Sequence, residues 1–195
     1  MIALLILKAI AALASLFTGM RRAAMFLGVS LASDLLRPTL QTMRASYPKP
    51  YTGEGFALWL PDVAIFLALP AVLLASVTRW TMGAALWLLA FVFVAVSYPG
   101  LRGDSLVTFY AAYYLTIYLG VSVLVVARSA TRKITPEEAL LLLFALSGIA
   151  GVILVVRFGA ENWSAARIPN GAAYAASLGV ALSACVRRPA SPPKT

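Results

Sequence analysis

Seven long apolar runs, separated by short polar segments, constrain the fold of this chain more than any other feature of its sequence. Each run is close to the roughly 20 residues that an α-helix needs to cross a hydrocarbon core of about 30 Å. The runs are continuous rather than alternating between polar and apolar residues, which favours helices over strands. They occupy residues 1–20, 23–42, 58–78, 80–97, 105–126, 138–156 and 171–186. We therefore predict an all-α, polytopic transmembrane helical bundle of about seven helices.

The composition also indicates a membrane protein with a single domain. Hydrophobic residues make up 62% of the 195-residue chain and charged residues 12%, whereas soluble proteins have about 25% charged residues. No segment between the runs is long enough to hold a second folded domain, so residues 1–186 are predicted to form a single transmembrane helical domain. Residues 187–195, "RRPASPPKT", are basic and rich in proline, which predicts a disordered basic tail.

The distribution of lysine and arginine predicts the orientation of this bundle. If all seven runs cross with the amino terminus outside, nine basic residues lie on the inner side and six on the outer side, with Lys8 within the membrane. Basic residues concentrate on the cytoplasmic side of membrane proteins, so we expect an outside amino terminus and a cytoplasmic carboxyl tail. If residues 23–43 instead form a re-entrant or interfacial segment, the count becomes seven inside and eight outside, which the same rule disfavours.

Several functional classes are disfavoured by residues and motifs that the chain lacks. It has no histidine and a single cysteine, Cys185, so His or Cys metal sites are not expected. The sequence contains no HExxH, no GxSxG and no glycine-rich phosphate loop, and we expect no enzymatic activity, no metal and no cofactor. The basic residues, with a net charge of +9, are scattered between runs rather than clustered. This predicts anionic lipid headgroups as partners, and no nucleic acid.

Asp34 is the residue that the membrane environment explains least. It lies in "LASDLLRPTLQTM", residues 31–43, and a carboxylate near the bilayer centre costs at least roughly 2.5 kcal/mol. Lys8 is at a comparable depth in the preceding run, and Arg37 lies one turn away from Asp34 on the same helix face. Pro38 is expected to open the backbone at the carbonyl of Asp34. We predict that Asp34 pairs with Lys8 or Arg37 beside a helix break.

Two features of the third run add polar groups near this pair. Asp62 follows Pro61 close to the expected helix start, where a first-turn carboxylate is favoured by the helix dipole. Pro70 lies in the middle of the run and leaves the carbonyl of Phe66 without its helical donor. Broken helices beside intramembrane charges are a recurring way to build binding sites in transporters.

A stripe of tyrosines follows in the fifth run, in "FYAAYYLTIY". Tyr110, Tyr114 and Tyr118 recur every four residues and Tyr113 flanks them, so their hydroxyls lie on one helix face. The leading hypothesis is a polar cavity that opens outward and binds or passes a small solute or a lipid headgroup. The residues predicted to bind the ligand or to form ion pairs are Lys8, Asp34, Arg37, Asp62, Tyr110, Tyr114 and Tyr118.

Three other interpretations of the polar residues stay open. In one, the charges only fix helix packing and the tyrosines fill the core. In another, the chain is an accessory or scaffold subunit of a larger complex, with other membrane proteins as partners. A remote one is a membrane enzyme with Asp34 or Asp62 as its base. The expected localisation is the cell membrane, multi-pass, most simply a bacterial inner membrane.

Local signals predict one helix start and one packing face. Thr135 and Glu138 have the spacing of a capping box, in which the two side chains cap each other's backbone N–H groups. Ala175, Gly179 and Ser183 form a stripe of small residues at four-residue spacing. Such stripes let helix backbones approach closely in membranes, so we expect this one to lie against a neighbouring helix.

The predicted orientation can be tested with a reporter protein fused after Lys194. Because basic residues favour the inner side when the tail is inside, we expect a reporter that is active only in the cytoplasm to be active at this position. A reporter that needs export should be inactive at the same position. Activity of the exported reporter would overturn the predicted orientation.

Overall fold

The computed structural model describes residues 2–46, 54–97, 104–158, 169 and 171–180, and its regular elements there are all α-helices. Seven helices are described, in agreement with the seven apolar runs. They are α1 (Ile2–Phe17), α2 (Arg21–Ala45), α3 (Glu54–Val77), α4 (Trp80–Ser97), α5 (Asp104–Ser129), α6 (Pro136–Phe158) and a last helix, Gly171–Val180. The predicted tail, residues 187–195, lies outside the described residues.

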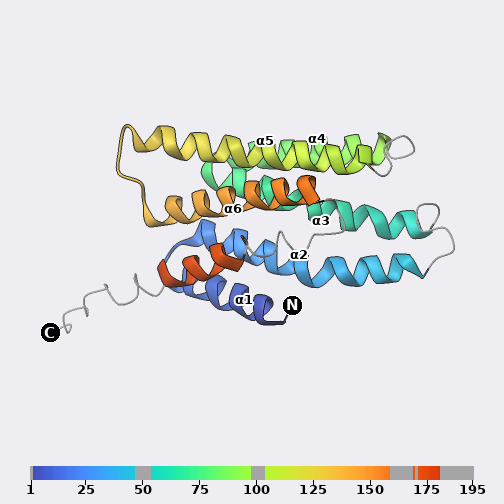
Figure 1. The fold of residues 1–195 in the computed structure, drawn as a ribbon, viewed down its shortest axis with the longest axis horizontal. Helices are drawn as coiled ribbons and strands as arrows, with labels where there is room; N and C mark the ends of the chain where they lie inside the picture. Colours follow the sequence, from blue (N-terminus) through green and yellow to red (C-terminus); the bar gives the residue numbers. More distant parts are fainter. Residues whose placement is uncertain (1, 47–53, 98–103, 159–168, 170, 181–195) are drawn as a thin grey trace.

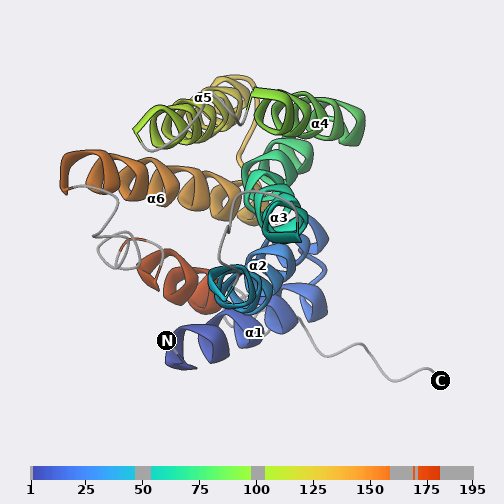
Figure 2. The same cartoon turned by 90° about the vertical axis from the view of Figure 1, so that its right-hand side faces the viewer.

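Helix α3 occupies the middle of the bundle. Consecutive helices from α1 to α6 run back and forth along the long axis of the molecule (Figure 1). Viewed from the end, α4 and α5 lie on one side of α3, and α1 and α2 lie on the other (Figure 2). Helix α3 contacts α2, α4, α5 and α6, and it is the most buried of the long apolar helices. The rest of the bundle is therefore arranged around α3.

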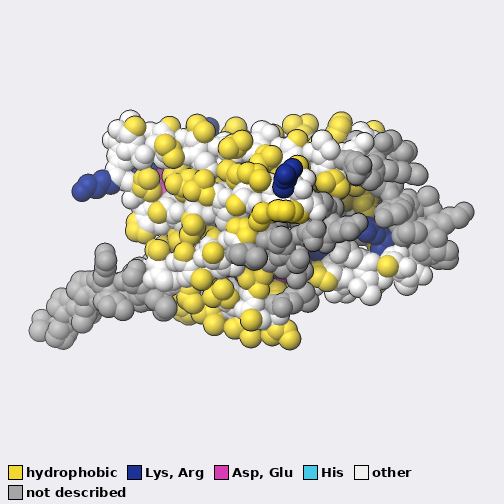
Figure 3. All heavy atoms as spheres, viewed as in Figure 1, with side chains coloured by type: hydrophobic (Ala, Val, Ile, Leu, Met, Phe, Trp, Pro, Cys, Tyr) yellow, Lys and Arg dark blue, Asp and Glu magenta, His cyan; other side chains and the backbone are white. Residues whose placement is uncertain are grey.

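Four helices are long and apolar enough to cross a membrane. They cover Ala57–Val77, Trp80–Ser97, Ser105–Ser129 and Pro136–Phe158. Helix α1 and the Gly171–Val180 helix are apolar but shorter, and α2 has 25 residues but too many polar ones to join this group. On the face of the bundle that Figure 3 shows, hydrophobic side chains extend along the helices with few Lys or Arg side chains among them. Length and composition thus support a membrane protein with four candidate spans.

The prolines do not interrupt the helices, which differs from the break predicted from the sequence. Helix α2 continues through Pro38 as one helix to Ala45, so the expected break beside Asp34 is absent. Helix α3 contains both Pro61 and Pro70 and begins at Glu54. Asp62 therefore lies more than two turns inside the helix, and the expectation of a first-turn carboxylate is wrong. Proline is tolerated inside membrane helices where neighbouring groups satisfy the freed backbone carbonyls.

Glutamates in the first turn of α6 cap two different helices. The predicted capping box is confirmed: Thr135 Oγ1 accepts a hydrogen bond from Glu138 N at 3.2 Å, and Glu138 Oε2 accepts one from Thr135 N at 3.2 Å. Glu137 reaches across to α2, where its Oε1 accepts hydrogen bonds from Arg22 N at 2.6 Å and Ala23 N at 3.2 Å. These N–H groups belong to the first turn of α2 and have no partner within that helix. The two acids therefore join the starts of α2 and α6.

Close helix contacts occur at glycines other than the one that we expected. Gly179 and Ala175 are exposed, and nothing lies within 4 Å of a Cβ built at Gly179; the predicted packing of this stripe is wrong, and Ser183 lies outside the described residues. A Cβ at Gly83 of α4 would instead lie 2.6 Å from the backbone oxygen of Ala71 in α3. Helices α3 and α4 thus approach each other closely at Gly83.

Substituting Gly83 tests this contact. Gly83→Ala places the new methyl group against the α3 backbone, so the helices must separate, and overpacking of this kind typically costs about 1–3 kcal/mol. We expect the unfolding temperature of the purified protein to fall. The matched control is Gly120→Ala in α5, where nothing lies within 4 Å of the added Cβ. That change should leave the temperature unchanged or raise it, since alanine favours helix by about 1 kcal/mol over glycine. Equal effects of the two substitutions would contradict the close approach.

Candidate functional site

A buried lysine joins α1, α2 and the last helix. Lys8 is 4% exposed, and its Nζ lies 2.5 Å from Asp34 Oδ2 and donates a hydrogen bond to Ser30 Oγ at 2.8 Å. The Ser30 hydroxyl is also hydrogen-bonded to the hydroxyl of Tyr174 at 2.9 Å. The lysine ammonium group lies 4.5 Å from the centre of the Tyr174 ring, within the range of a cation–π contact. The predicted contact between Lys8 and Asp34 is therefore present.

Arg37 does not join this pair, although it lies one turn from Asp34. Its Nε is 2.7 Å from Oδ1 of Asp62 in α3, and its guanidinium group lies 4.3 Å from the centre of the Phe66 ring. Two further α2 side chains contact the other carboxylate oxygen: Gln41 Nε2 donates a hydrogen bond to Asp62 Oδ2 at 3.4 Å, and Arg44 Nη1 lies 3.8 Å away. Three side chains spread over two turns of α2 thus hold one buried carboxylate of α3.

A small cavity lies beside this second ion pair. It has a volume of about 180 Å³ and is formed by α2, α3 and α5. At about 30 Å³ per molecule it has room for roughly six waters, which is less than the about 300 Å³ of the smallest typical ligand pockets. Its size suits a small polar group rather than a whole lipid. The lining residues are Arg37, Arg44, Trp59, Asp62, Val63, Phe66, Leu106 and Tyr110.

The tyrosine stripe is divided between the cavity and the helix core. Tyr110 lines the cavity. Tyr114 is buried, and its hydroxyl donates a hydrogen bond to the carbonyl of Phe66 at 2.6 Å, which is the carbonyl that Pro70 leaves without a helical donor. Tyr118 is 4% exposed and packs against Gly148 of α6, because a Cβ at Gly148 would overlap its ring. The contacts of Tyr114 and Tyr118 are those of packed core residues.

The predicted site residues therefore form two clusters rather than one cavity. Lys8 and Asp34 form the first cluster with Ser30 and Tyr174, while Arg37, Asp62 and Tyr110 belong to the second. Whether either cluster binds a ligand stays a prediction. Within the described residues, no group of three or more His, Cys, Asp or Glu side chains could hold a metal ion.

Sequence reasoning missed Ser30, Gln41, Arg44 and Tyr174. Ser30 lies four residues before Asp34, and Gln41 and Arg44 lie four and seven residues after Arg37, so all of these α2 residues share one helix face. That spacing was the sequence signal that could have identified the three α2 residues. No sequence signal pointed to Tyr174, because only the folded bundle brings the last helix to Lys8.

Comparisons with known proteins assign no family to this chain. No protein-family model matches it, and no curated protein and no solved structure matches it either. The function must therefore be argued from the geometry of the two clusters.

A pair of variants tests the first cluster. Asp34→Asn leaves Lys8 without its counter-ion, and breaking a buried ion pair from one side typically costs about 3–5 kcal/mol. The loss of stability should lie toward the lower end of this range, because the Asp34 side chain is 39% exposed. The double variant Lys8→Met with Asp34→Asn removes both charges and should recover most of the loss in unfolding temperature. If the double variant were as unstable as the single one, the ion pair would not explain the burial of Lys8.

Proposed function

We propose that this chain is a non-enzymatic, multi-pass membrane protein that binds a small anionic group in the cavity between α2, α3 and α5. The group would be the carboxylate or phosphate of a small solute or of a lipid headgroup. The observation that carries this proposal is the cavity of about 180 Å³ beside the pair of a half-buried Arg37 and a buried Asp62. Charged residues at membrane depth usually pair with one another, and many of them mark binding sites or transport pathways.

The guanidinium group of Arg37 supports an anionic ligand. A guanidinium group has five N–H donors, and in the described part of the chain Arg37 uses one of them, through Nε, for Asp62. The remaining donors match the geometry of a carboxylate or phosphate, which arginine binds in a bidentate manner. Trp59 and Phe66 form apolar walls beside the charged groups. A few polar groups in an otherwise apolar lining are typical of ligand sites.

The position of the cavity along α3 supports an outward opening. Asp62 lies in the first half of α3, the half nearer to the end of the bundle where α2 finishes and α3 begins (Figure 1). With the amino terminus outside and the carboxyl tail in the cytoplasm, this end faces outward. The basic residues at the opposite end support the same orientation through the positive-inside rule. The membrane that this arrangement suits is a cell membrane, most simply a bacterial inner membrane.

The alternative, an accessory subunit, receives less support from the described surface. Helix α4 buries only Gly83, Ala90 and Val94 and exposes large apolar side chains. Lipid chains would cover such a face equally well. The exposed face therefore does not require a protein partner. Purification in a mild detergent distinguishes the two functions, because a subunit should bring a second protein at a fixed ratio.

Anion titrations of the protein in dodecyl maltoside micelles test the cavity. Inorganic phosphate and acetate, added at constant ionic strength against chloride, should raise the unfolding temperature in a saturable manner. A ligand at one hundred times its dissociation constant stabilises the folded state by about 2.7 kcal/mol. The double variant Arg37→Gln with Asp62→Asn keeps the pair neutral and should lose the shift with both anions.

The control for this experiment is Lys8→Met with Asp34→Asn. It also removes one buried ion pair, but neither residue lines the cavity, so it should keep the shift. Retention of the shift by the Arg37→Gln and Asp62→Asn variant would place anion binding elsewhere and refute the proposed function.

A further inference from the structure

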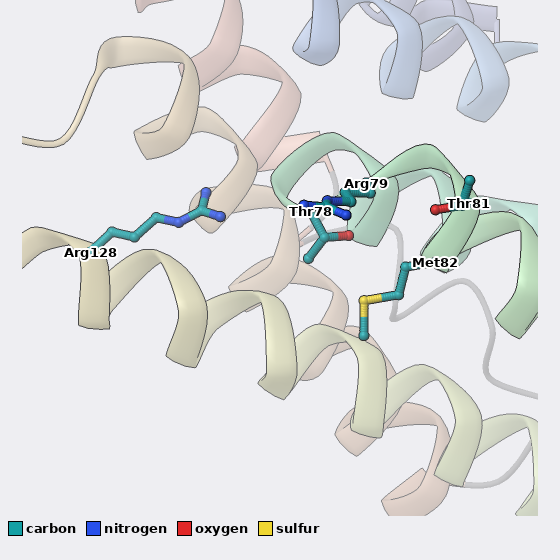
Figure 4. Close-up of a pocket in the computed structure, with 5 residues that line it drawn as sticks. All are labelled: Thr78, Arg79, Thr81, Met82 and Arg128. Atoms are coloured by element: carbon teal, nitrogen blue, oxygen red, sulfur yellow. The ribbon is translucent and has the colours of Figure 1, made fainter.

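A second hollow lies at the opposite end of α3 from the cavity. It has a volume of about 550 Å³ and forms where α3 ends, α4 begins and the last turns of α5 pass by. Its lining residues are Thr78, Arg79, Thr81, Met82 and Arg128, and Figure 4 shows both arginine side chains at this junction. The hollow is open to the surface and combines two guanidinium groups with two hydroxyl groups. We call it the α3–α4 hollow.

The two arginines of the hollow differ in how they are held. Arg128 is fixed, because its Nη2 donates a hydrogen bond to the carbonyl of Val77 at 2.7 Å and its Nη1 lies 3.6 Å from Glu138 Oε1. Arg79 is exposed and makes no side-chain hydrogen bond or ion pair with any described residue. One cation is therefore positioned in advance and the other is available to an incoming anion.

Positive charge is in excess around the hollow. This end of the bundle holds six basic residues and two acidic ones among the described residues. Both acids already have partners: Glu138 Oε1 is 2.6 Å from Arg132 Nη2, and Glu137 caps the start of α2. The uncompensated charge favours an anionic partner from outside the chain. The residues are Arg21, Arg22, Arg79, Arg128, Arg132 and Lys133, with Glu137 and Glu138.

The level of the hollow matches that of a lipid headgroup. It lies directly after the apolar span Ala57–Val77 and at the start of the span Trp80–Ser97. The end of a membrane-spanning helix is the level at which headgroup phosphates lie. The exposed side chain of Trp80 adds the aromatic residue that is typical of this interface.

An apolar strip on α4 leads away from the hollow toward the middle of the membrane. It starts at Met82, which lines the hollow, and continues through Leu89, Phe93 and Val96, all exposed. Residues 7, 11 and 14 positions apart lie on one face of an α-helix. A ligand with its phosphate in the hollow can therefore lay a hydrocarbon chain along this strip.

We propose that the α3–α4 hollow binds the phosphate of an anionic phospholipid, with Arg79 and Arg128 contacting the phosphate and one acyl chain lying along Met82, Leu89 and Phe93. This site is separate from the cavity at the start of α3 and does not depend on the function proposed for that cavity. A free phosphate ion shares the headgroup chemistry but would not use the apolar strip. The experiment must therefore separate the two sources.

The test compares phospholipid binding by two variants of equal charge. The wild-type protein and each variant, in neutral detergent micelles, are titrated with phosphatidylglycerol and with phosphatidylcholine, and bound lipid is counted by native mass spectrometry. Arg79→Gln removes the free cation of the hollow, and the Arg79 side chain makes no hydrogen bond or ion pair with a residue that the structure describes. Arg21→Gln removes an exposed charge from the same end of the bundle, outside the hollow.

We expect the wild-type protein to retain phosphatidylglycerol in preference to phosphatidylcholine. Arg79→Gln should weaken the affinity for phosphatidylglycerol at least about fivefold more than Arg21→Gln does, since one basic residue near an anionic headgroup contributes roughly that factor. Leu89→Gln should also weaken it, because it interrupts the apolar strip. Inorganic phosphate at the same concentration should not displace the lipid.

Three results would overturn the proposal. Equal losses with Arg79→Gln and Arg21→Gln would mean a diffuse attraction to the whole end of the bundle. Displacement of the lipid by inorganic phosphate, with no effect of Leu89→Gln, would mean a free-phosphate site. No preference for phosphatidylglycerol over phosphatidylcholine in the wild-type protein would mean that the hollow does not select the anionic headgroup.

Discussion

Helix α3 is fixed in the bundle by hydrogen bonds that side chains of its neighbours donate to its backbone carbonyls. Tyr114 of α5 donates to the carbonyl of Phe66, which has lost its helical donor to Pro70. Trp87 of α4 donates to the carbonyl of Ala64 at 2.9 Å. A carbonyl without a partner in hydrocarbon costs several kcal/mol, so the hydrogen bond from Tyr114 favours this rotation of α3, and the bond from Trp87 agrees with it. The same rotation turns Asp62 toward α2, and the cavity beside Asp62 depends on it.

Helix α2 directs a partly buried polar stripe toward neighbouring helices and exposes leucines on its other side. Its buried face starts with Leu27 and Ser30 and continues, at alternating spacings of four and three residues, into a polar stripe. Leu35 and Leu36 are more than half exposed on the other side. Charged groups that pair with neighbouring helices while leucines face outward are the pattern expected of a helix packed among others in lipid. The later part of the stripe consists of Asp34, Arg37, Gln41 and Arg44.

Local features of the fold were predictable from the sequence, whereas most contacts between distant residues were not. The helices followed from the lengths of the apolar runs, and the Thr135–Glu138 capping box from two residues three apart. The contact of Lys8 with Asp34 was predictable because two charges at similar expected depth in adjacent helices that are predicted to cross the membrane have few other partners. The hydrogen bond from Ser30 to Tyr174 was not, since it depends on where the last helix docks. Small residues such as Gly179 permit close packing without requiring it, and the described bundle packs a different face of that helix.

The choice of cation for each carboxylate follows from how deeply Asp34 and Asp62 are buried. The side chain of Asp34 is 39% exposed and that of Asp62 is 8% exposed. Desolvation penalises the more deeply buried charge more strongly, so Asp62 needs more donors than Asp34. Asp34 is satisfied by the single ammonium group of Lys8, while Asp62 draws Arg37 away from its near neighbour on α2. Arg37 is thereby placed between α2 and α3, and among the described residues only its Nε donates a hydrogen bond.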